Sequence, residues 1–233
     1  MKKTLLTTLA LTIASASGIA AYAQDSLSVS AGADLVSRYV WRGMDQCSGV
    51  SLQPSLGLTY KGFTLSAWGS CSVADIDVEE FDISLSYTIG NFSIGVTDYF
   101  WQGASASYGH YTDDHFYELN LGYTVSEKVP LTLSWNTMFL AGKSAEYDED
   151  GDRMYSSYFN IGYAFDVHGI ELSPAIGINP WKSQYDDEFS IMDITLTASK
   201  DIKITESFTL PIFAQVIASP ATDKARLVFG VSF

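Results

Sequence analysis

LSVSAGADLVSRYVWRGM, residues 27–44, alternates apolar and polar side chains over most of its length. Its odd-numbered residues form an apolar row, broken by one serine, that ends at Tyr39 and Trp41. Successive strand side chains point to opposite faces, so the ionic residues share the other face: Asp34, Arg38 and Arg42. Tyr and Trp favour a membrane–water boundary. The stretch therefore predicts the first strand of a transmembrane barrel with its ionic face toward the lumen.

The N-terminus has the parts of a secretory signal peptide. Lys2 and Lys3 precede an apolar run to about residue 13, and small residues follow, ending at Ala23. The run is shorter than the roughly 20 residues that a membrane-spanning helix needs. We predict cleavage after Ala23, which gives a signal peptide at 1–23 and a barrel at 24–233. Losing both lysines takes the formal net charge from −14 to −16.

The composition narrows the function classes. The chain has 27 acidic and 13 basic residues, and this balance argues against nucleic-acid binding, which needs a basic surface. It also has 14 Tyr, 13 Phe and 5 Trp, yet after the leader no apolar stretch is long enough for a transmembrane helix. Alternating strands of a membrane barrel account for both features.

The same alternation recurs along the chain in segments of about ten residues separated by turn residues, as in outer-membrane barrels. The segments are 51–60, 63–73, 81–89, 92–97, 115–125, 131–141, 154–165, 170–180, 189–199, 207–218 and 225–233. With the first segment they predict an all-β fold, a transmembrane antiparallel up-and-down barrel of about 12 strands.

The connections between the segments fix the orientation. Short or acid-poor turns fall at 61–62, 90–91, 126–130, 166–169 and 200–206. The other connections are mostly longer and carry the Asp/Glu clusters, as extracellular loops do. Aromatic residues flank the short turns, as in an interfacial girdle: Tyr60, Phe63, Tyr87, Phe92, Tyr123, Tyr163, Phe165 and Phe208. A secreted sandwich or lipocalin-like barrel also alternates, but few lysines on the polar face favour the membrane.

Residues 35–46, LVSRYVWRGMDQ, resemble the first strand of the TorF-like porin family of small Gram-negative outer-membrane proteins. The shared pattern is Leu-Val-Ser-x-Tyr-x-x-Arg-Gly, and residues 67–70, AWGS, are similar to a later motif of that family. The terminal Phe233 resembles the signal read by the barrel-assembly machinery. The resemblance implies an outer-membrane channel and leaves the solute open.

Alternation aims charged side chains into the predicted lumen: Asp34, Arg38, Arg42, Asp82, Glu118, Glu171, Asp193 and Arg226. These side chains form either a salt-bridge lattice that fills the barrel or the lining of a water-filled pore. A barrel of this size lies between filled eight-stranded barrels and wide porins. It permits a narrow channel partly plugged by three aromatic residues: Trp68, Tyr99 and Trp101.

We therefore predict a porin-like channel for passive diffusion of small hydrophilic solutes, without a cofactor. The expected partners are outer-membrane lipid, lipopolysaccharide and, during biogenesis, the barrel-assembly machinery. The alternative is a structural or adhesion-type barrel with a closed lumen and functional acidic extracellular loops.

An outer-membrane hydrolase is the third hypothesis. His168 is predicted in a periplasmic turn and His110 in a loop, whereas His115 follows two aspartates at the outer rim. Nucleophilic catalysis needs a base within hydrogen-bond reach of the nucleophile, and no serine motif of that kind is present. We predict no enzymatic activity.

Two smaller features stay open at this point. Asp148, Asp150 and Asp152 have the spacing of a calcium loop but lack the later glutamate that completes it, so a solvated surface is the stronger interpretation. Cys47 and Cys71 are predicted near the same rim, where they form either a disulfide, which export permits, or two free thiols.

Overall fold

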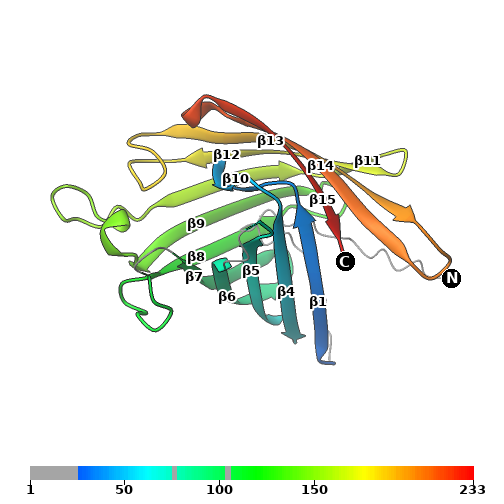
Figure 1. Cartoon of the computed structure of the whole chain (residues 1–233), viewed down its shortest axis with the longest axis horizontal. Helices are drawn as coiled ribbons and strands as arrows, with labels where there is room; N and C mark the ends of the chain where they lie inside the picture. Colours follow the sequence, from blue (N-terminus) through cyan, green and yellow to red (C-terminus); the bar gives the residue numbers. More distant parts are fainter. Residues whose placement is uncertain (1–25, 75–77, 103–105) are drawn as a thin grey trace.

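The computed structural model describes residues 26–74, 78–102 and 106–233, and it shows a closed barrel of antiparallel strands (Figure 1). The predicted signal peptide lies outside these residues. The described residues include two short 3-10 helices, η1 (Lys143–Glu146) and η2 (Pro220–Thr222). Within the described part of the chain, no helix has the length and hydropathy needed to cross a membrane.

Twelve strands form the barrel wall in up-and-down order, which confirms the predicted fold. They are β1 (Ser28–Val36), β4 (Ser51–Tyr60), β5 (Phe63–Ser72), β6 (Val78–Ile89), β7 (Phe92–Trp101), β8 (His115–Thr124), β9 (Leu131–Ala141), β10 (Ser157–Tyr163) with β11 (Phe165–Val167), β12 (Ile170–Asn179), β13 (Ser190–Lys203), β14 (Thr209–Ser219) and β15 (Lys224–Ser232). We count β10 and β11 as one wall strand, because both pair with β12 and only Ala164 separates them.

The barrel closes at a short seam between β1 and β15. Their register covers Asp34–Val36 against Gly230–Ser232, and backbone hydrogen bonds between Ala33 and Phe233 extend it by one residue pair. Phe233 lies beside Ala33, in the middle of β1. Below this point β1 and β14 diverge (Figure 1).

The two faces of the wall differ as the alternation predicts. Large apolar side chains stand exposed on the outside, among them Leu56, Leu85, Val216 and Leu227, each more than half exposed. Most of the aromatic residues beside the short turns are also exposed. A soluble protein rarely exposes a contiguous apolar surface of this extent, whereas a membrane barrel requires one.

The first predicted strand is wrong beyond Val36. The chain leaves the wall there and forms a separate hairpin of β2 (Tyr39–Trp41) and β3 (Met44–Cys47). Arg42 and Gly43 make its tight turn with φ values of +50° and +75°, both in the left-handed region, as type I′ hairpin turns require. Tyr39 and Trp41 are each only 5% exposed and lie inside the barrel, away from any lipid boundary.

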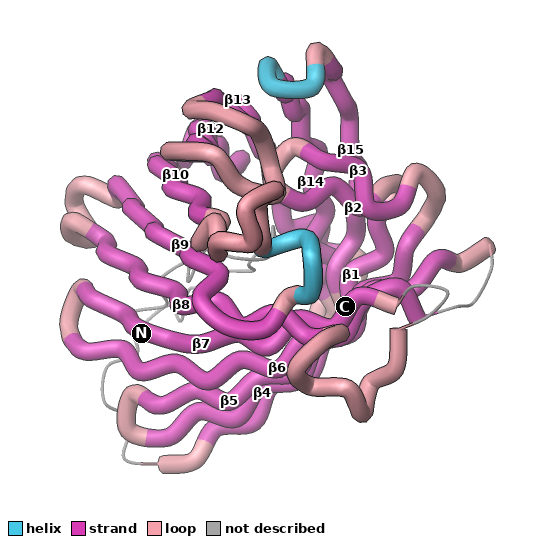
Figure 2. The backbone as a smooth tube through the Cα atoms, turned by 90° about the vertical axis from the view of Figure 1, so that its left-hand side faces the viewer, coloured by secondary structure: helices cyan, strands magenta, loops and turns pink. Residues whose placement is uncertain are grey.

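We call residues 39–47 the plug hairpin. Figure 2 views the barrel from its long-loop end and shows β2 and β3 beside β14 and β15, with η1 near the middle of the opening. A Cβ on Gly43 would collide with the backbone oxygen of Met192 on β13 and crowd the Ser219 hydroxyl. The tip of the hairpin therefore packs directly against the wall, and only glycine fits there.

Candidate functional site

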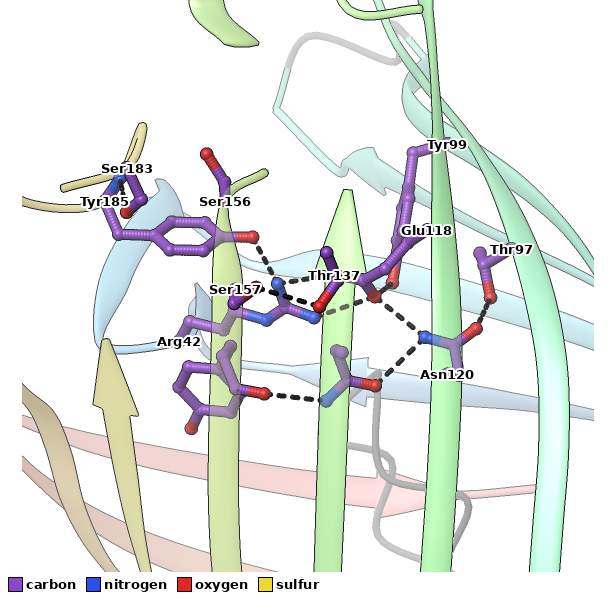
Figure 3. A network of polar contacts seen from close by, with 12 residues as sticks. Arg42, Thr97, Tyr99, Glu118, Asn120, Thr137, Ser156, Ser157, Ser183 and Tyr185 are labelled. Carbon is purple, nitrogen blue, oxygen red and sulfur yellow. Dashed lines mark hydrogen bonds and ion pairs between the residues drawn. The ribbon is translucent and has the colours of Figure 1, made fainter. Parts of the chain in front are cut away.

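Arg42, at the turn of the plug hairpin, is the centre of the polar network inside the barrel (Figure 3). Its Nη1 lies 2.8 Å from Oε1 of Glu118, and its Nη2 donates to Oε2 of Glu118 at 2.9 Å. Nη1 also donates to the hydroxyl of Tyr185, from the loop between β12 and β13. The side chains of the ion pair are 1% and 0% exposed, so water contributes almost nothing to their solvation.

Aromatic rings enclose the Arg42 guanidinium. Its central carbon lies 4.4 Å from the ring centroid of Trp41, 4.8 Å from that of Tyr158 and 5.3 Å from that of Tyr185. These contacts are cation–π interactions, which gain strength away from water. The rings belong to one buried cluster: Tyr39, Trp41, Trp68, Tyr99, Met138, Tyr158, Tyr185 and Met192, with Trp101 packed against it. The three aromatic residues expected to plug the lumen are part of this packing.

The plug hairpin is also tied to the wall at other points around the barrel. The Tyr39 hydroxyl donates to Oε2 of Glu80 on β6 at 2.7 Å. On the other side, Arg226 Nε of β15 donates to Oδ2 of Asp45 at 2.8 Å. The Ser219 hydroxyl at the end of β14 donates to the Gly43 carbonyl at 2.9 Å. The hairpin is thus held to the wall on both sides. It lies in the half of the barrel that carries the long loops, which we call the outer half.

Glu118 connects the plug hairpin to a hydrogen-bond chain along the inner wall. Tyr99 donates to its Oε2 at 2.9 Å, and the Asn120 amide donates to the same oxygen at 2.8 Å. Asn120 in turn accepts from the Thr97 hydroxyl and donates to Asn136 (Figure 3). The carboxylate therefore has several donors besides Arg42, as a buried charge requires.

The predicted lumen residues do not form a single lattice. Arg42, Glu118, Asp82 and Asp193 are buried in the outer half, where the Tyr158 hydroxyl donates to Asp193 at 2.8 Å. Arg226 is buried at the wall. The other three lie elsewhere: Arg38 pairs with Asp45 at a part-exposed position, Asp34 is half-buried beside the seam, and Glu171 is half-buried toward the turn between β11 and β12.

The inner wall changes along the barrel axis. On β4, Ser51 and Gln53 are buried at the plug, whereas Ser55 and Thr59 further along are half-buried. On β13, Asp193 is buried, but the hydroxyl residues after it are half-buried: Thr195, Thr197 and Ser199. Since these side chains point inward, their exposure is to the lumen. The barrel therefore has a filled outer half and a solvent-accessible inner half lined mainly by hydroxyls, amides and glycines.

Two parts of the site were missed by the sequence reasoning. Glu80 falls just before the predicted strand at 81–89, whereas β6 begins at Val78. Its position two residues before Asp82 indicates an inward side chain, because residues i and i+2 of a strand share a face. The inward hairpin was also missed, since Tyr39 and Trp41 fit a period of two on a lipid face as well.

Two ionisable side chains in the long loops, Glu146 and Tyr185, have raised pKa values. Burial raises the pKa of the Glu146 carboxyl in η1, and hydrogen bonding from Ser156, whose N–H donates at 3.2 Å, partly offsets this rise. Burial also raises the pKa of the Tyr185 hydroxyl, while Arg42 acts in the opposite direction. Both groups are held neutral more strongly than in water, as expected where loops fold into the mouth of the barrel.

His115 does not have the arrangement of a catalytic histidine. Its Nδ1 lies 2.6 Å from Oδ1 of Asp98, and its Nε2 lies 2.8 Å from the Tyr108 carbonyl. Tyr111 stacks on the ring at 4.4 Å between centroids. Both nitrogens thus have acceptor partners, and no serine or threonine of the described residues bonds to the ring. The histidine–carboxylate pair anchors the loop that ends at β8.

The structure also places the aspartate loop and the two cysteines. Asp148 uses its Oδ1 to accept the backbone N–H groups of Asp150 and Asp152, and no group of three or more metal-ligating side chains occurs in the described part of the chain. Cys47 and Cys71 are free thiols in this structure. Cys47 belongs to the plug hairpin, whereas Cys71 shares the outward face with Leu52, its register partner, so the wall separates the two.

A family model described as a bacterial protein of unknown function (Gcw_chp) matches residues 20–215. The chain belongs to this family. Among solved structures, the NanC porin matches with a TM-score of 0.50 and 8% identity, over 87% of this chain and 98% of that one. The KdgM porin matches with a TM-score of 0.48 and 14% identity, over 88% and 98%. No curated protein matches. The likeness to NanC shows a porin-like barrel fold, and the TorF-like resemblance stays a prediction.

Proposed function

We propose that this protein is an outer-membrane channel for small hydrophilic solutes, closed at rest by the plug hairpin. The observation that carries the proposal is the change along the inner wall, from the buried Arg42–Glu118 pair to half-buried hydroxyl residues such as Thr59 and Thr195. A lumen lined by small polar side chains suits hydrated, uncharged or weakly charged solutes. Movement of the hairpin would join this inner lumen to the outside.

The membrane location belongs to the same proposal. The exposed apolar belt, with Leu85 and Leu227 more than half exposed, supports insertion into lipid. A cleaved leader at 1–23 would export the chain, and Phe233 would serve recognition by the barrel-assembly machinery. The acidic outer loops would then face lipopolysaccharide.

A second candidate function has an observation in its favour. The outer lumen is filled by the Arg42–Glu118 pair and by tightly packed rings such as Tyr99 and Trp101, which stack with centroids 5.0 Å apart. A permanently closed barrel of this kind would act through its acidic loops, as a structural or adhesion protein. For catalysis the geometry of His115 offers no support, and we propose no enzymatic role.

The deciding experiment is conductance of refolded residues 24–233 in a planar bilayer, compared with Arg42→Ala and Arg38→Ala. If the hairpin closes a channel, the wild type shows brief, small steps, and Arg42→Ala shows longer or larger ones because the hairpin loses its central anchor. Arg38→Ala removes a weaker anchor of the same hairpin, since Arg38 is part-exposed and pairs with Asp45, and it should therefore change the steps less than Arg42→Ala does. A folded barrel without steps in all three forms would contradict the channel and favour the closed barrel.

A further inference from the structure

Two buried acids on β6 face the plug hairpin and are unused by the network around Arg42. Glu80 and Asp82 are 1% and 2% exposed, and their side chains share the inward face because they are two residues apart. Two carboxylates buried side by side repel unless something positive neutralises them.

No arginine or lysine of the described residues forms an ion pair with Glu80 or Asp82. Among the described residues, the buried cations are Arg42 and Arg226. Arg42 is matched by Glu118 with both of its terminal nitrogens, and Arg226 donates to Asp45. When ionised, Glu80 and Asp82 therefore add negative charge inside the barrel that neither of these arginines pairs with.

Several polar atoms at this place lack hydrogen-bond donors or acceptors. Glu80 receives the Tyr39 hydroxyl on Oε2, but its Oε1 and both carboxylate oxygens of Asp82 have no such donor among the described residues. Buried carboxylate oxygens are seldom left this way in native proteins. Trp68 and Tyr99 are the cross-strand neighbours of Asp82. Both rings belong to the buried cluster around Arg42, which we call the plug cluster. Ring faces favour a cation.

We infer that Glu80 and Asp82 bind one monovalent metal cation, Na⁺ or K⁺, beside the plug hairpin and so make the channel cation-selective. The selectivity rests on the proposed function, whereas the binding does not. Two carboxylates beside the Tyr39 hydroxyl oxygen suit an alkali ion. Ca²⁺ usually takes six to eight oxygen ligands, and no cluster of three metal-ligating side chains occurs in the described residues. Acidic side chains at a constriction are a known source of cation selectivity.

Binding is tested by thermal unfolding of the refolded full barrel, followed by tryptophan fluorescence. NaCl or KCl replaces N-methylglucamine chloride at constant ionic strength. A ligand that binds only the folded state raises the unfolding temperature with its concentration. We expect this rise in the wild type and its loss in Asp82→Asn and Glu80→Gln. Glu149→Gln, in an exposed loop, is the matched control and keeps the rise. No rise in the unfolding temperature of the wild type would overturn the site and would mean that a proton alone neutralises the pair. The same rise in all variants would also overturn it.

Conductance then separates this inference from the proposed function. Reversal potentials in a tenfold KCl gradient should indicate cation selectivity in the wild type and a shift toward zero in Asp82→Asn. A cation-dependent unfolding temperature without conductance would keep the site and remove the channel. If the protein conducts, but neither its ion selectivity nor its unfolding temperature changes in the Glu80 and Asp82 variants, the channel is supported and the cation site is refuted.

Discussion

The two terminal nitrogens of Arg42 meet the two carboxylate oxygens of Glu118 at 2.8 and 2.9 Å, in a pair that water does not reach. This two-point geometry holds the turn of an inward hairpin to the opposite part of the barrel wall. A buried ion pair is of little net benefit when intact, but removal of one partner leaves the other charge unsolvated. The pair therefore fixes the position of the hairpin more than it raises stability.

The first prediction concerns this pair. Arg42→Met should destabilise the barrel by about 3–5 kcal/mol, because Glu118 is left buried and charged. The double variant Arg42→Met/Glu118→Gln should be less destabilised than Arg42→Met alone, since glutamine keeps partners for Tyr99 and Asn120 without a charge. Urea unfolding in lipid vesicles gives both values. Additive effects of the two single substitutions would contradict direct coupling.

Most of the wall could be predicted because its side chains obey a single local rule. The predicted segments 51–60 and 131–141 coincide with β4 and β9. In these strands, successive side chains point alternately out of the barrel and into the lumen. The plug hairpin could not be predicted this way. Tyr39 and Trp41 satisfy the same period whether they face lipid or the lumen, and only long-range partners such as Glu80 distinguish the two.

The contacts of the site are also long-range in sequence. Alternation predicts that Glu118 points inward, but its pairing with Arg42 joins residues 76 positions apart. No local pattern carries that information. Tyr185 is a stronger example, since it lies in an acidic loop that a sequence pattern assigns to solvent, yet its ring is buried on the guanidinium.

The second prediction follows from Glu146, whose pKa in the folded protein is raised by burial above its ordinary value of 4.5. A raised pKa means that the folded state binds the proton more tightly than the unfolded state. The contribution to stability is thus complete below pH 4.5 and is lost as the pH rises through the folded pKa. Glu146→Gln should match the wild type at low pH and become relatively more stable as the pH rises.

Unfolding midpoints of both proteins between pH 4 and pH 8 test this expectation. Glu149→Gln serves as the control, because Glu149 is exposed in the same loop region. The informative quantity is the difference between variant and wild type, in which the other titrating groups largely cancel. A constant difference across the range would mean that Glu146 is not the group responsible.

The third prediction uses Gly177 on β12, which makes room for two buried side chains of the neighbouring strands. A Cβ there would overlap the Tyr158 hydroxyl and Oδ2 of Asp193, which bond to each other. Gly177→Ala should destabilise the barrel by about 1–3 kcal/mol through overpacking and should increase conductance by loosening the rings around Arg42. Gly109→Ala is the control, since its Cβ would meet nothing within 4 Å. Equal unfolding temperatures for both variants would refute the crowding.

The fourth prediction concerns the cysteines. Since the wall separates Cys47 from Cys71, alkylation of the unreduced, unfolded chain should add two groups, visible by mass spectrometry. In the folded barrel in lipid, Cys71 should react with a membrane-permeant maleimide faster than Cys47, which packs against the plug cluster. A chain that takes up no label until reduced would show a disulfide and contradict the placement of the hairpin.

The last prediction separates lipid from water outside the wall. Leu85 is 54% exposed on the outward face of β6, and its neighbour Ser86 points inward. In a soluble barrel, Leu85→Arg would place a charge in water and change stability little. In a bilayer it should cost about 2–4 kcal/mol if the residue lies near the midplane, because arginine replaces leucine in hydrocarbon. Leu85→Ala provides the control for lost apolar area. Unfolding in vesicles decides between the two environments: a cost for arginine no greater than that for alanine would place this face in water, and it would remove the membrane on which the proposed channel depends.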